Sequence, residues 1–332
     1  MNTFFSRLNC PRRAALIIYI VISLTGVFAL GGCADELAAY NELSEFRVLA
    51  LRSSQPVLAP DAVATVEPLV FVPGETAVSY AWSWCPLPAE EDGDLRCAIA
   101  HEDLAATVRK HAGTSEITVP AYDLGSADSV QFGHFLPAQS LAAICYELAQ
   151  KGISRPLELP DCEVGMPFVI TLRAESGTAV TAAKELVLLA SEPQALNQNP
   201  LIRGVSVAAV DDSAGTPMTM PADQPIPLAQ ETEYELILDI APDSVERYRP
   251  VKDSQDSPAP TERAEQLAIT WFVEGGETEF TRTSFIEGES DLDTASRNQW
   301  TTPAQSGNAE LHFVIRDDRG GLNWLSRQAV IE

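Results

Sequence analysis

The sequence predicts a mainly β fold of two antiparallel β-sandwiches, the first carrying a small helical, disulfide-bounded insertion. Short stretches of alternating apolar and polar residues recur along the chain, with turn residues between them, and such alternation is typical of half-buried strands. Residues 191–200 contain two prolines and no apolar periodicity, so they are expected to be a linker with little to pack against, and they divide these stretches into two sets. An apolar content of 45% is that of a globular chain rather than of a disordered stalk.

The chain begins with an export signal. Three arginines, with no acidic residue before them, precede an uncharged apolar run from Ala14 to Leu30. A basic start, an apolar middle and small residues at a cleavage site are the features of a signal peptide. Leu30-Gly31-Gly32-Cys33 resembles the lipobox of bacterial lipoproteins, which implies that residues 1–32 are removed and that Cys33 carries lipid. An uncleaved signal anchor is the alternative, because the 17-residue run is slightly long for a signal core, although it is at the short end for a membrane span.

The same resemblance bears on localisation. In lipoproteins of this kind an aspartate directly after the cysteine often signals retention at the inner membrane, and this chain has Ala34 there. The expected location is therefore the outer membrane, with the membrane as a partner through the lipid on Cys33. Residues 33–44 are expected to form a short polar tether.

Residues 45–190 hold the first set of strands. In the third of them Val78, Tyr80, Trp82 and Trp84 alternate with small or polar residues, so the tryptophans are expected in the core. A turn at Gly177 joins the last two strands into a hairpin. The expected strands are residues 46–51, 63–72, 77–85, 168–174 and 181–189.

Residues 86–163 interrupt this pattern and form the predicted insertion. The segment starts proline-rich and acidic, and it continues with expected helices at 102–111 and 137–151. The second helix has proline at its start and glycine at its end. Its apolar face consists of Leu141, Ile144, Cys145 and Leu148 at helical spacing.

Residues 201–332 form the second set, with Trp271 expected in the core. The polar, proline-rich segment 242–263 is expected to be a mobile loop, and His312 is expected to face outward from its strand. Trp300 and Trp324 have less regular surroundings, and the sequence leaves exposed positions open to them. The expected strands are residues 201–210, 233–240, 269–273, 311–315 and 324–331, with a turn at 317–321.

The second half resembles an immunoglobulin-like β-sandwich, as found in many bacterial surface proteins. Trp271 on a central strand and the late hairpin across Asp317–Gly321 carry this resemblance. Residues 46–85 with 168–189 resemble a first sandwich of the same sort, split by the insertion. The whole chain is similar to lipoproteins of unassigned role in large-genome environmental bacteria, a resemblance that implies no activity.

Four cysteines remain once Cys10 leaves with the signal and Cys33 takes lipid. An even number of cysteines in an exported chain predicts disulfides, and four allow three pairings. Sequence separations of 12 and 17 residues favour the local pairs Cys85–Cys97 and Cys145–Cys162. A zinc site is disfavoured because no closely spaced Cys-x2-Cys pair occurs.

Charge and motifs exclude several functions. The formal net charge is −25, and removal of the three signal arginines makes the mature chain more acidic still, which argues against nucleic-acid binding. No nucleophile elbow, zinc-protease motif, phosphate loop or dinucleotide fingerprint occurs. The four histidines, His101, His111, His134 and His312, have no partner in the sequence pattern that would make a general base. We therefore predict neither an enzyme nor a cofactor.

Calcium is the one metal that the sequence brings into question, because it prefers several oxygen ligands together. The weak candidates are Glu90, Glu91, Asp92 and Asp94, and a second group is Glu289, Asp291 and Asp293. Neither group matches an EF-hand loop, so solvated loops are favoured and no metal is predicted.

The resulting expectation is a non-enzymatic, lipid-anchored envelope protein. It would bind or scaffold another envelope component, a protein or a glycan, with residues 86–163 as the distinctive surface. One alternative is a binder of a small glycan-type ligand, or an envelope enzyme, with its site in that segment. A passive surface or stalk protein is the other.

Overall fold

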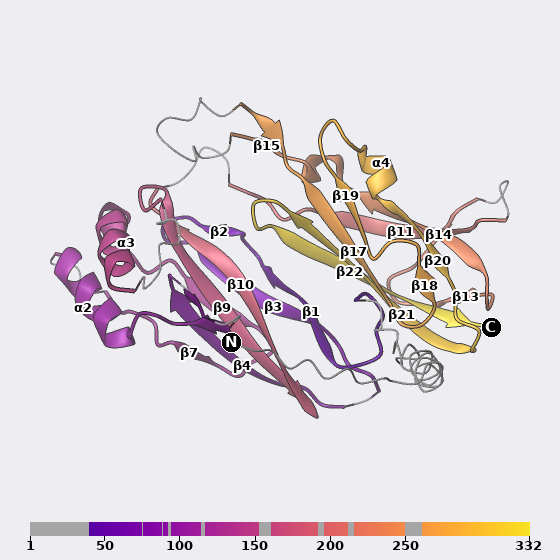
Figure 1. The fold of residues 1–332 in the computed structure, drawn as a ribbon, viewed down its shortest axis with the longest axis horizontal. Coiled ribbons are helices and arrows are strands. Elements are labelled where there is room, and N and C mark those ends of the chain that lie inside the picture. The colour runs from indigo at the N-terminus through magenta and orange to yellow at the C-terminus, as the bar shows by residue number, and fades with distance from the viewer. Residues whose placement is uncertain are drawn as a thin grey trace, which may run out of the picture. The chain divides into compact units, whose positions relative to one another are not determined.

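Residues Tyr40–Glu332 form one compact unit of two β-sandwiches in the computed structural model (Figure 1). The signal segment and Cys33 lie outside the described residues. No helix among those described is long and apolar enough to cross a bilayer. The structure describes residues 40–74, 76–87, 89–91, 94–113, 117–152, 161–191, 196–211, 216–249 and 261–332, without the side chains of 89–96 and 152.

The first sandwich pairs a three-stranded with a five-stranded sheet. Its strands are β1 (Arg47–Ser53), β2 (Val57–Leu58), β3 (Val63–Phe71), β4 (Ser79–Pro86), β7 (Asp123–Gly125), β8 (Val130–Gly133), β9 (Gly165–Ser176) and β10 (Thr178–Leu189). The sheets have the orders β1-β3-β8 and β2-β10-β9-β4-β7. The predicted hairpin is β9 and β10, and Gly177 makes its turn at a φ of 75°, a backbone conformation that glycine adopts without a steric cost.

The second sandwich pairs two five-stranded sheets, β12-β11-β14-β20-β18 and β13-β22-β21-β17-β19. The first of these sheets contains β11 (Ile202–Ala209), β12 (Met218–Thr219), β14 (Glu233–Ile240), β18 (Glu277–Thr278) and β20 (Arg297–Thr301). The second contains β13 (Ile226–Leu228), β17 (Leu267–Val273), β19 (Arg282–Phe285), β21 (Gly307–Asp317) and β22 (Leu322–Ile331). A short helix, α4 (Leu292–Ala295), precedes β20.

The two sandwiches share one connectivity. In each, the first strand, β1 or β11, belongs to one sheet, and a short later strand belongs to the other sheet. This short strand pairs in parallel with the last strand of the sandwich, as β2 does with β10 and β13 with β22. The other pairs of named strands in the described part of both sandwiches are antiparallel. This is an immunoglobulin-like arrangement, so the predicted fold class is confirmed, with one parallel pair in each sandwich.

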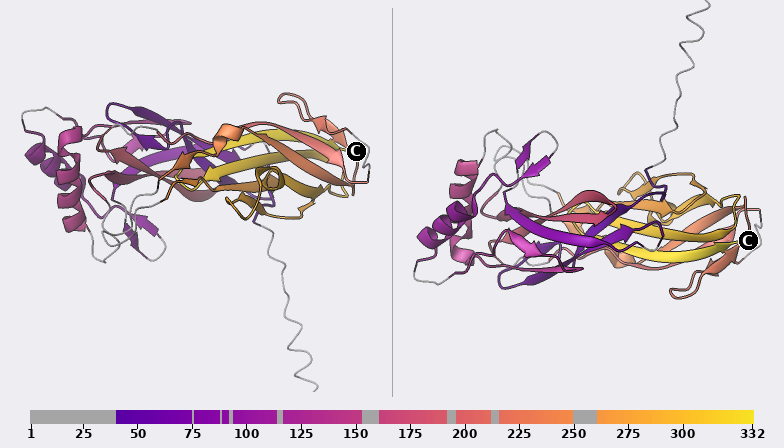
Figure 2. Two further views of the ribbon diagram at one scale, coloured as in Figure 1. Left: turned by 90° about the horizontal axis from the view of Figure 1, so that it is seen from above. Right: turned by 90° about the horizontal axis from the view of Figure 1, so that it is seen from below.

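The segment 86–163 is not a continuous insertion, because it supplies β7 and β8 to the first sandwich. The additions are two: a hairpin of β5 (Ala89–Glu91) and β6 (Asp94–Arg96) with helix α2 (His101–His111) between β4 and β7, and helix α3 (Ala138–Gly152) between β8 and β9. The helices α2 and α3 lie side by side, as Figures 1 and 2 both show. We call this pair the helical layer.

Each sandwich has its own apolar core. Trp82, Trp84 and Trp271 are buried as predicted. The expected apolar face of α3, Leu141, Ile144, Cys145 and Leu148, is also fully buried. The indole N–H groups of Trp82 and Trp84 donate to Ala127 O at 2.7 Å and Ala121 O at 2.8 Å, so burial leaves neither unsatisfied.

The sequence left open whether Trp300 is exposed. In the structure this side chain is fully buried between the sheets of the second sandwich. It lies on β20, where it pairs with Tyr234 of β14. Its indole nitrogen donates to Gly275 O at 3.2 Å. Gly276 has a φ of 74° and packs so closely that a Cβ would lie 2.7 Å from that nitrogen. Trp324 is partly buried.

The predicted loop 242–263 contains ordered structure at both ends. It begins with a 3-10 helix, η1 (Pro242–Ser244), followed by β15 (Arg247–Tyr248). β15 pairs with β16 (Arg263–Ala264) in a two-stranded sheet. Residues 250–260 lie outside the described part.

Candidate functional site

A shared apolar layer joins the two sandwiches. Leu49, Ala50, Leu69 and Phe71 from the first sandwich meet residues of the second, and all are buried. The partners from the second sandwich are Phe272, Val314 and Leu322, with the partly buried Trp324 packed against them. We call this layer, with the polar contacts that surround it, the joint.

His312 belongs to this region, and it faces outward from its strand as predicted. It points away from the core of its own sandwich, as the alternation requires, but it is only 5% exposed. Its ring lies edge-on to that of Phe71, 6.4 Å between centroids, and its Nδ1 lies 2.8 Å from Ser326 Oγ. Burial lowers the pKa of this imidazole, because burial penalises its charged form.

The chain enters the described part at the joint. The Asn41 amide nitrogen donates to Trp271 O at 2.8 Å and to Thr278 Oγ1 at 2.6 Å. The backbones of Asn41 and Leu43 exchange hydrogen bonds with Val273 at 3.0–3.1 Å. The end of the predicted tether therefore forms an isolated parallel bridge, Glu42 with Val273, to the second sandwich before the chain starts the first.

The predicted linker 191–200 also makes specific contacts. Asn199 bridges the sandwiches, because its Nδ2 donates to Ser53 O at 2.7 Å and its Oδ1 accepts from Leu322 N at 2.9 Å. Asn197 is buried, and its Nδ2 donates to Asp317 Oδ2 at 3.3 Å. The expectation that this segment has little to pack against is therefore wrong for these two residues.

A cavity of about 340 Å³ opens at the joint. β1 and β10 line it on one side, and the end of β21 with the turn into β22 lines it on the other. Its walls include Val48, Leu51, Ala182 and Leu322. We call it the joint cleft. None of its lining residues belongs to the segment 86–163, where the small-ligand alternative placed a site.

The joint cleft is lined by two cations, Lys184 from β10 and Arg316 from β21, and by the carboxylates that follow them, Glu185 and Asp317. The Lys184 ammonium donates to Gly320 O across the joint. The Arg316 guanidinium donates to Thr270 Oγ1 and to Leu49 O, both at 3.3 Å. Burial lowers the pKa of Lys184 to about 8 and also lowers the pKa of Arg316.

An acidic cluster surrounds Arg319 beside the joint. Arg319 Nη1 lies 3.2 Å from Glu246 Oε2 and 2.9 Å from Glu265 Oε1. Glu265 is buried, and its burial, with the nearby charge of Asp317, raises its pKa to about 7. Because one guanidinium serves two carboxylates, it only partly offsets the cost of burying Glu265.

The helical layer is tied together by Glu147 of α3. Its carboxylate lies 2.6 Å from Lys110 Nζ, 2.7 Å from His111 Nε2 and 3.1 Å from Lys151 Nζ. Hydrogen bonds from these groups, Lys110 first, lower the pKa of Glu147 to about 2. Ser140 Oγ donates to the backbone oxygen of His111 at 2.9 Å, not to its imidazole, so these residues make an ionic brace rather than a nucleophile with its base.

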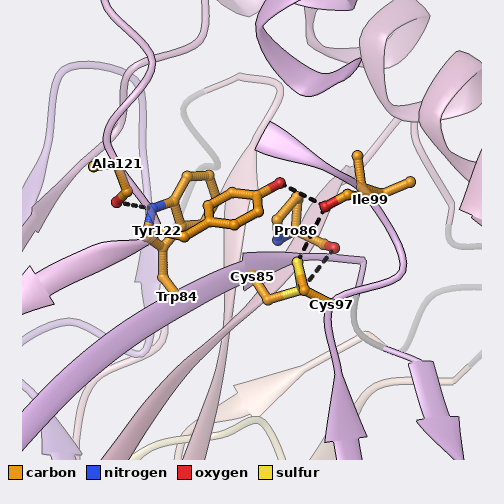
Figure 3. The surroundings of a disulfide bond; sticks show 7 residues. All are labelled: Trp84, Cys85, Pro86, Cys97, Ile99, Ala121 and Tyr122. Carbon is orange, nitrogen blue, oxygen red and sulfur yellow. Dashed lines mark hydrogen bonds between the residues drawn. A yellow bond between two sulfur atoms is a disulfide. The ribbon is translucent and has the colours of Figure 1, made fainter. Parts of the chain in front are cut away.

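Two disulfides fasten this part of the chain, Cys85–Cys97 and Cys145–Cys162, which are the two local pairs. Figure 3 shows the first beside Trp84 and Tyr122. The Tyr122 hydroxyl donates to Ile99 O at 2.9 Å, and its ring meets that of Trp84 edge-on, 5.3 Å between centroids. Burial raises the pKa of Tyr122 to about 12, so this hydroxyl stays protonated at neutral pH.

The calcium candidates divide into two cases. Asp92 and the side chains of Glu90, Glu91 and Asp94 lie outside the described part. In the other group Asp291 caps α4, accepting from Thr294 N at 2.7 Å, and Asp293 pairs with Arg297 at 2.9 Å. No cluster of three or more metal-binding side chains occurs among the described residues.

His101 and His134 have structural partners. His101 Nε2 lies 3.0 Å from Pro120 O, and its ring meets Tyr122 edge-on, 5.1 Å between centroids. His134 Nε2 lies 2.9 Å from Leu189 O. The Nε2 atom of each ring therefore contacts a backbone carbonyl oxygen, and His134 is itself buried.

No family model and no curated protein matches the chain. Solved structures resemble it only distantly. The three N-terminal domains of the outer capsid protein Hoc from bacteriophage RB49 match with 10% identity and a TM-score of 0.18, over 87% of this chain and 70% of that one. Red sea bream transglutaminase gives 13% and 0.22, over 88% and 32%. The C-terminal domain of Streptococcus pyogenes AspA gives 11% and 0.20, over 86% and 100%. These scores are too low to transfer a function.

Proposed function

We propose that this protein is a lipid-anchored protein of the outer membrane that binds or scaffolds another envelope component without catalysing a reaction. The lipobox-like segment ending at Cys33, with Ala34 after it, supports the anchor and the location. The strongly acidic charge argues against a nucleic-acid partner.

The observation that carries the binding role is the helical layer. Two helices, an ionic brace and two disulfides build a firm surface there, and the helices are fixed to the first sandwich because Leu104, Val108 and Leu141 belong to its core. Additions of this kind on a rigid scaffold commonly carry recognition. Tyr146 on α3 is 39% exposed, and exposed tyrosines are typical of binding surfaces.

The anchor is tested at its cysteine. Mass spectrometry of the mature N-terminal peptide is expected to find lipid on Cys33, and Cys33→Ser is expected to leave an uncleaved or mislocalised chain. An unmodified peptide running through residues 25–40 would contradict the lipoprotein proposal.

The binding role is tested by placing a photo-crosslinking amino acid at Tyr146 in cells. Phe280 on the second sandwich is 51% exposed and serves as the matched control position. We expect one discrete crosslinked envelope component from position 146 and none from position 280. Equal crosslinking from both positions, or none from 146, would rule out the helical layer as the binding surface.

A further inference from the structure

We propose that the joint cleft is a binding site for a small organic carboxylate with a short aliphatic part, held by Lys184 and Arg316. This site is independent of the binding role proposed for the helical layer. The argument rests on the size of the cleft, the balance of its charges and the character of its walls.

The size of the cleft selects the scale of ligand. A volume of about 340 Å³ is at the lower end of the range for small-molecule sites, roughly 300–1,000 Å³. A glycan chain or a peptide segment needs a longer groove, so the fitting ligand is a single small molecule.

The charges select the sign of the ligand. Among the described residues, neither Lys184 nor Arg316 has a carboxylate within ion-pair distance, although the chain carries 47 acidic residues. Both cations donate only to neutral oxygens, Lys184 to one and Arg316 to two. An ammonium has three donors and a guanidinium five, which leaves donors on each for an anion.

The acidic groups nearest to Lys184 do not form an ion pair with it. Asp317 turns its Oδ1 to the backbone N–H groups of Arg319 and Gly321, at 2.8 and 2.7 Å. Glu185 also lines the cleft, but it follows Lys184 directly on β10, so its side chain points to the opposite face of the sheet and is exposed. Burial, and to a lesser extent the charge of Arg316, favour the neutral form of Lys184, whereas Asp317 and Glu185 oppose them. An anion between the two cations would offset the cost of burying them.

The walls of the cleft indicate that the rest of the ligand is a short hydrocarbon part. Val48, Leu51, Ala182 and Leu322 are aliphatic and lie on both sides of the cleft. A short hydrocarbon part would cover them, and a carboxylate offers two oxygens to a guanidinium. Because Lys184 belongs to the first sandwich and Arg316 to the second, a bound carboxylate would also link the sandwiches across the joint.

The test is calorimetric titration of hexanoate into the full exported chain made without lipid, with hexanol and hexylamine as probes of equal length. We expect hexanoate alone to bind, and its Kd to rise about tenfold or more in Lys184→Met, as loss of a charged hydrogen bond predicts. Lys110→Met, in the helical layer, is the matched control and should leave the Kd unchanged.

A pH series on the unaltered chain gives a second readout that does not depend on a variant. Hexanoate affinity should fall as the pH rises through about 8, where Lys184 loses its charge, and this dependence should vanish in Lys184→Met. Hexanol binding as tightly as hexanoate, no binding of hexanoate at millimolar concentration, or a pH profile that is flat in the unaltered chain would each overturn the proposal.

Discussion

Glu265 makes the surroundings of the joint sensitive to pH. Its burial, with the nearby charge of Asp317, gives it a pKa of about 7 in the folded chain against an ordinary value of 4.5, although Arg319, which it shares with Glu246, lowers this pKa. The folded state therefore binds a proton on Glu265 more tightly than the unfolded state does. Its contribution to stability is complete below pH 4.5 and is lost as the pH rises through 7.

We predict that Glu265→Gln removes this dependence. In urea unfolding between pH 4.5 and 8, the free energy of unfolding of the unaltered chain should fall relative to that of the variant as the pH rises. Glu185→Gln, at an exposed position, should keep the dependence of the unaltered chain. A difference between the unaltered chain and Glu265→Gln that is constant across this range would show that Glu265 titrates at its ordinary pKa.

The residue scale also shows what the sequence could not predict. The alternation on β21 correctly places Leu311, Phe313 and Ile315 in the core and His312 on the opposite face. It does not reveal that the first sandwich covers this opposite face. Trp300 was missed for a related reason: its burial depends on the close approach of Gly276, about 24 residues away in sequence.

At the scale of elements, the two disulfides differ in access. Cys97 is exposed, whereas Cys145 and Cys162 are both completely buried. A reductant must reach a sulfur in order to attack it. We predict that mild reductant opens Cys85–Cys97 first in the folded chain. Differential alkylation with peptide mapping measures the order, and simultaneous loss of both bonds without unfolding would contradict it.

The ionic brace predicts a local effect within the helical layer. Glu147 has a pKa of about 2, so its stabilisation is present above pH 4.5 and is lost as the pH falls toward 2. Glu147→Gln should speed hydrogen exchange in α2 at neutral pH, because Lys110 and His111 lose their partner. Glu163→Gln, at an exposed site outside both helices, is the control. Unchanged exchange in α2 would mean that apolar packing alone holds the helices together.

For the candidate sites too, features determined by short sequence spacing could be predicted, whereas a site assembled from distant residues could not. The two helices and the local cysteine pairs are visible in the sequence because spacing over a few residues determines them. The joint cleft brings together Lys184 and Arg316, which lie 132 positions apart. In the sequence each looks like an ordinary outward-facing residue of a strand, so only the packing of the two sandwiches assembles this site.

At the scale of the whole molecule, Trp271 and Phe272 separate the stability of one sandwich from that of the joint. They are neighbours on β17 but point to opposite faces, Trp271 into the core of the second sandwich and Phe272 into the joint. Trp271 also donates to Thr283 Oγ1 at 2.9 Å. Residues 198–332 contain the whole second core, so we expect this fragment to fold alone with a cooperative melt.

The matched substitutions are Trp271→Ala and Phe272→Ala, each made in the full chain and in the fragment 198–332. Trp271→Ala should cost roughly 3–5 kcal/mol in both, since its core is the same in both. Phe272→Ala should cost about as much in the full chain but close to nothing in the fragment, where no first sandwich covers it. Chemical denaturation followed by circular dichroism measures all four differences.

A non-cooperative fragment would mean that the second sandwich needs the first in order to fold. An equal cost of Phe272→Ala in both settings would mean that this side chain stabilises its own sandwich rather than the joint.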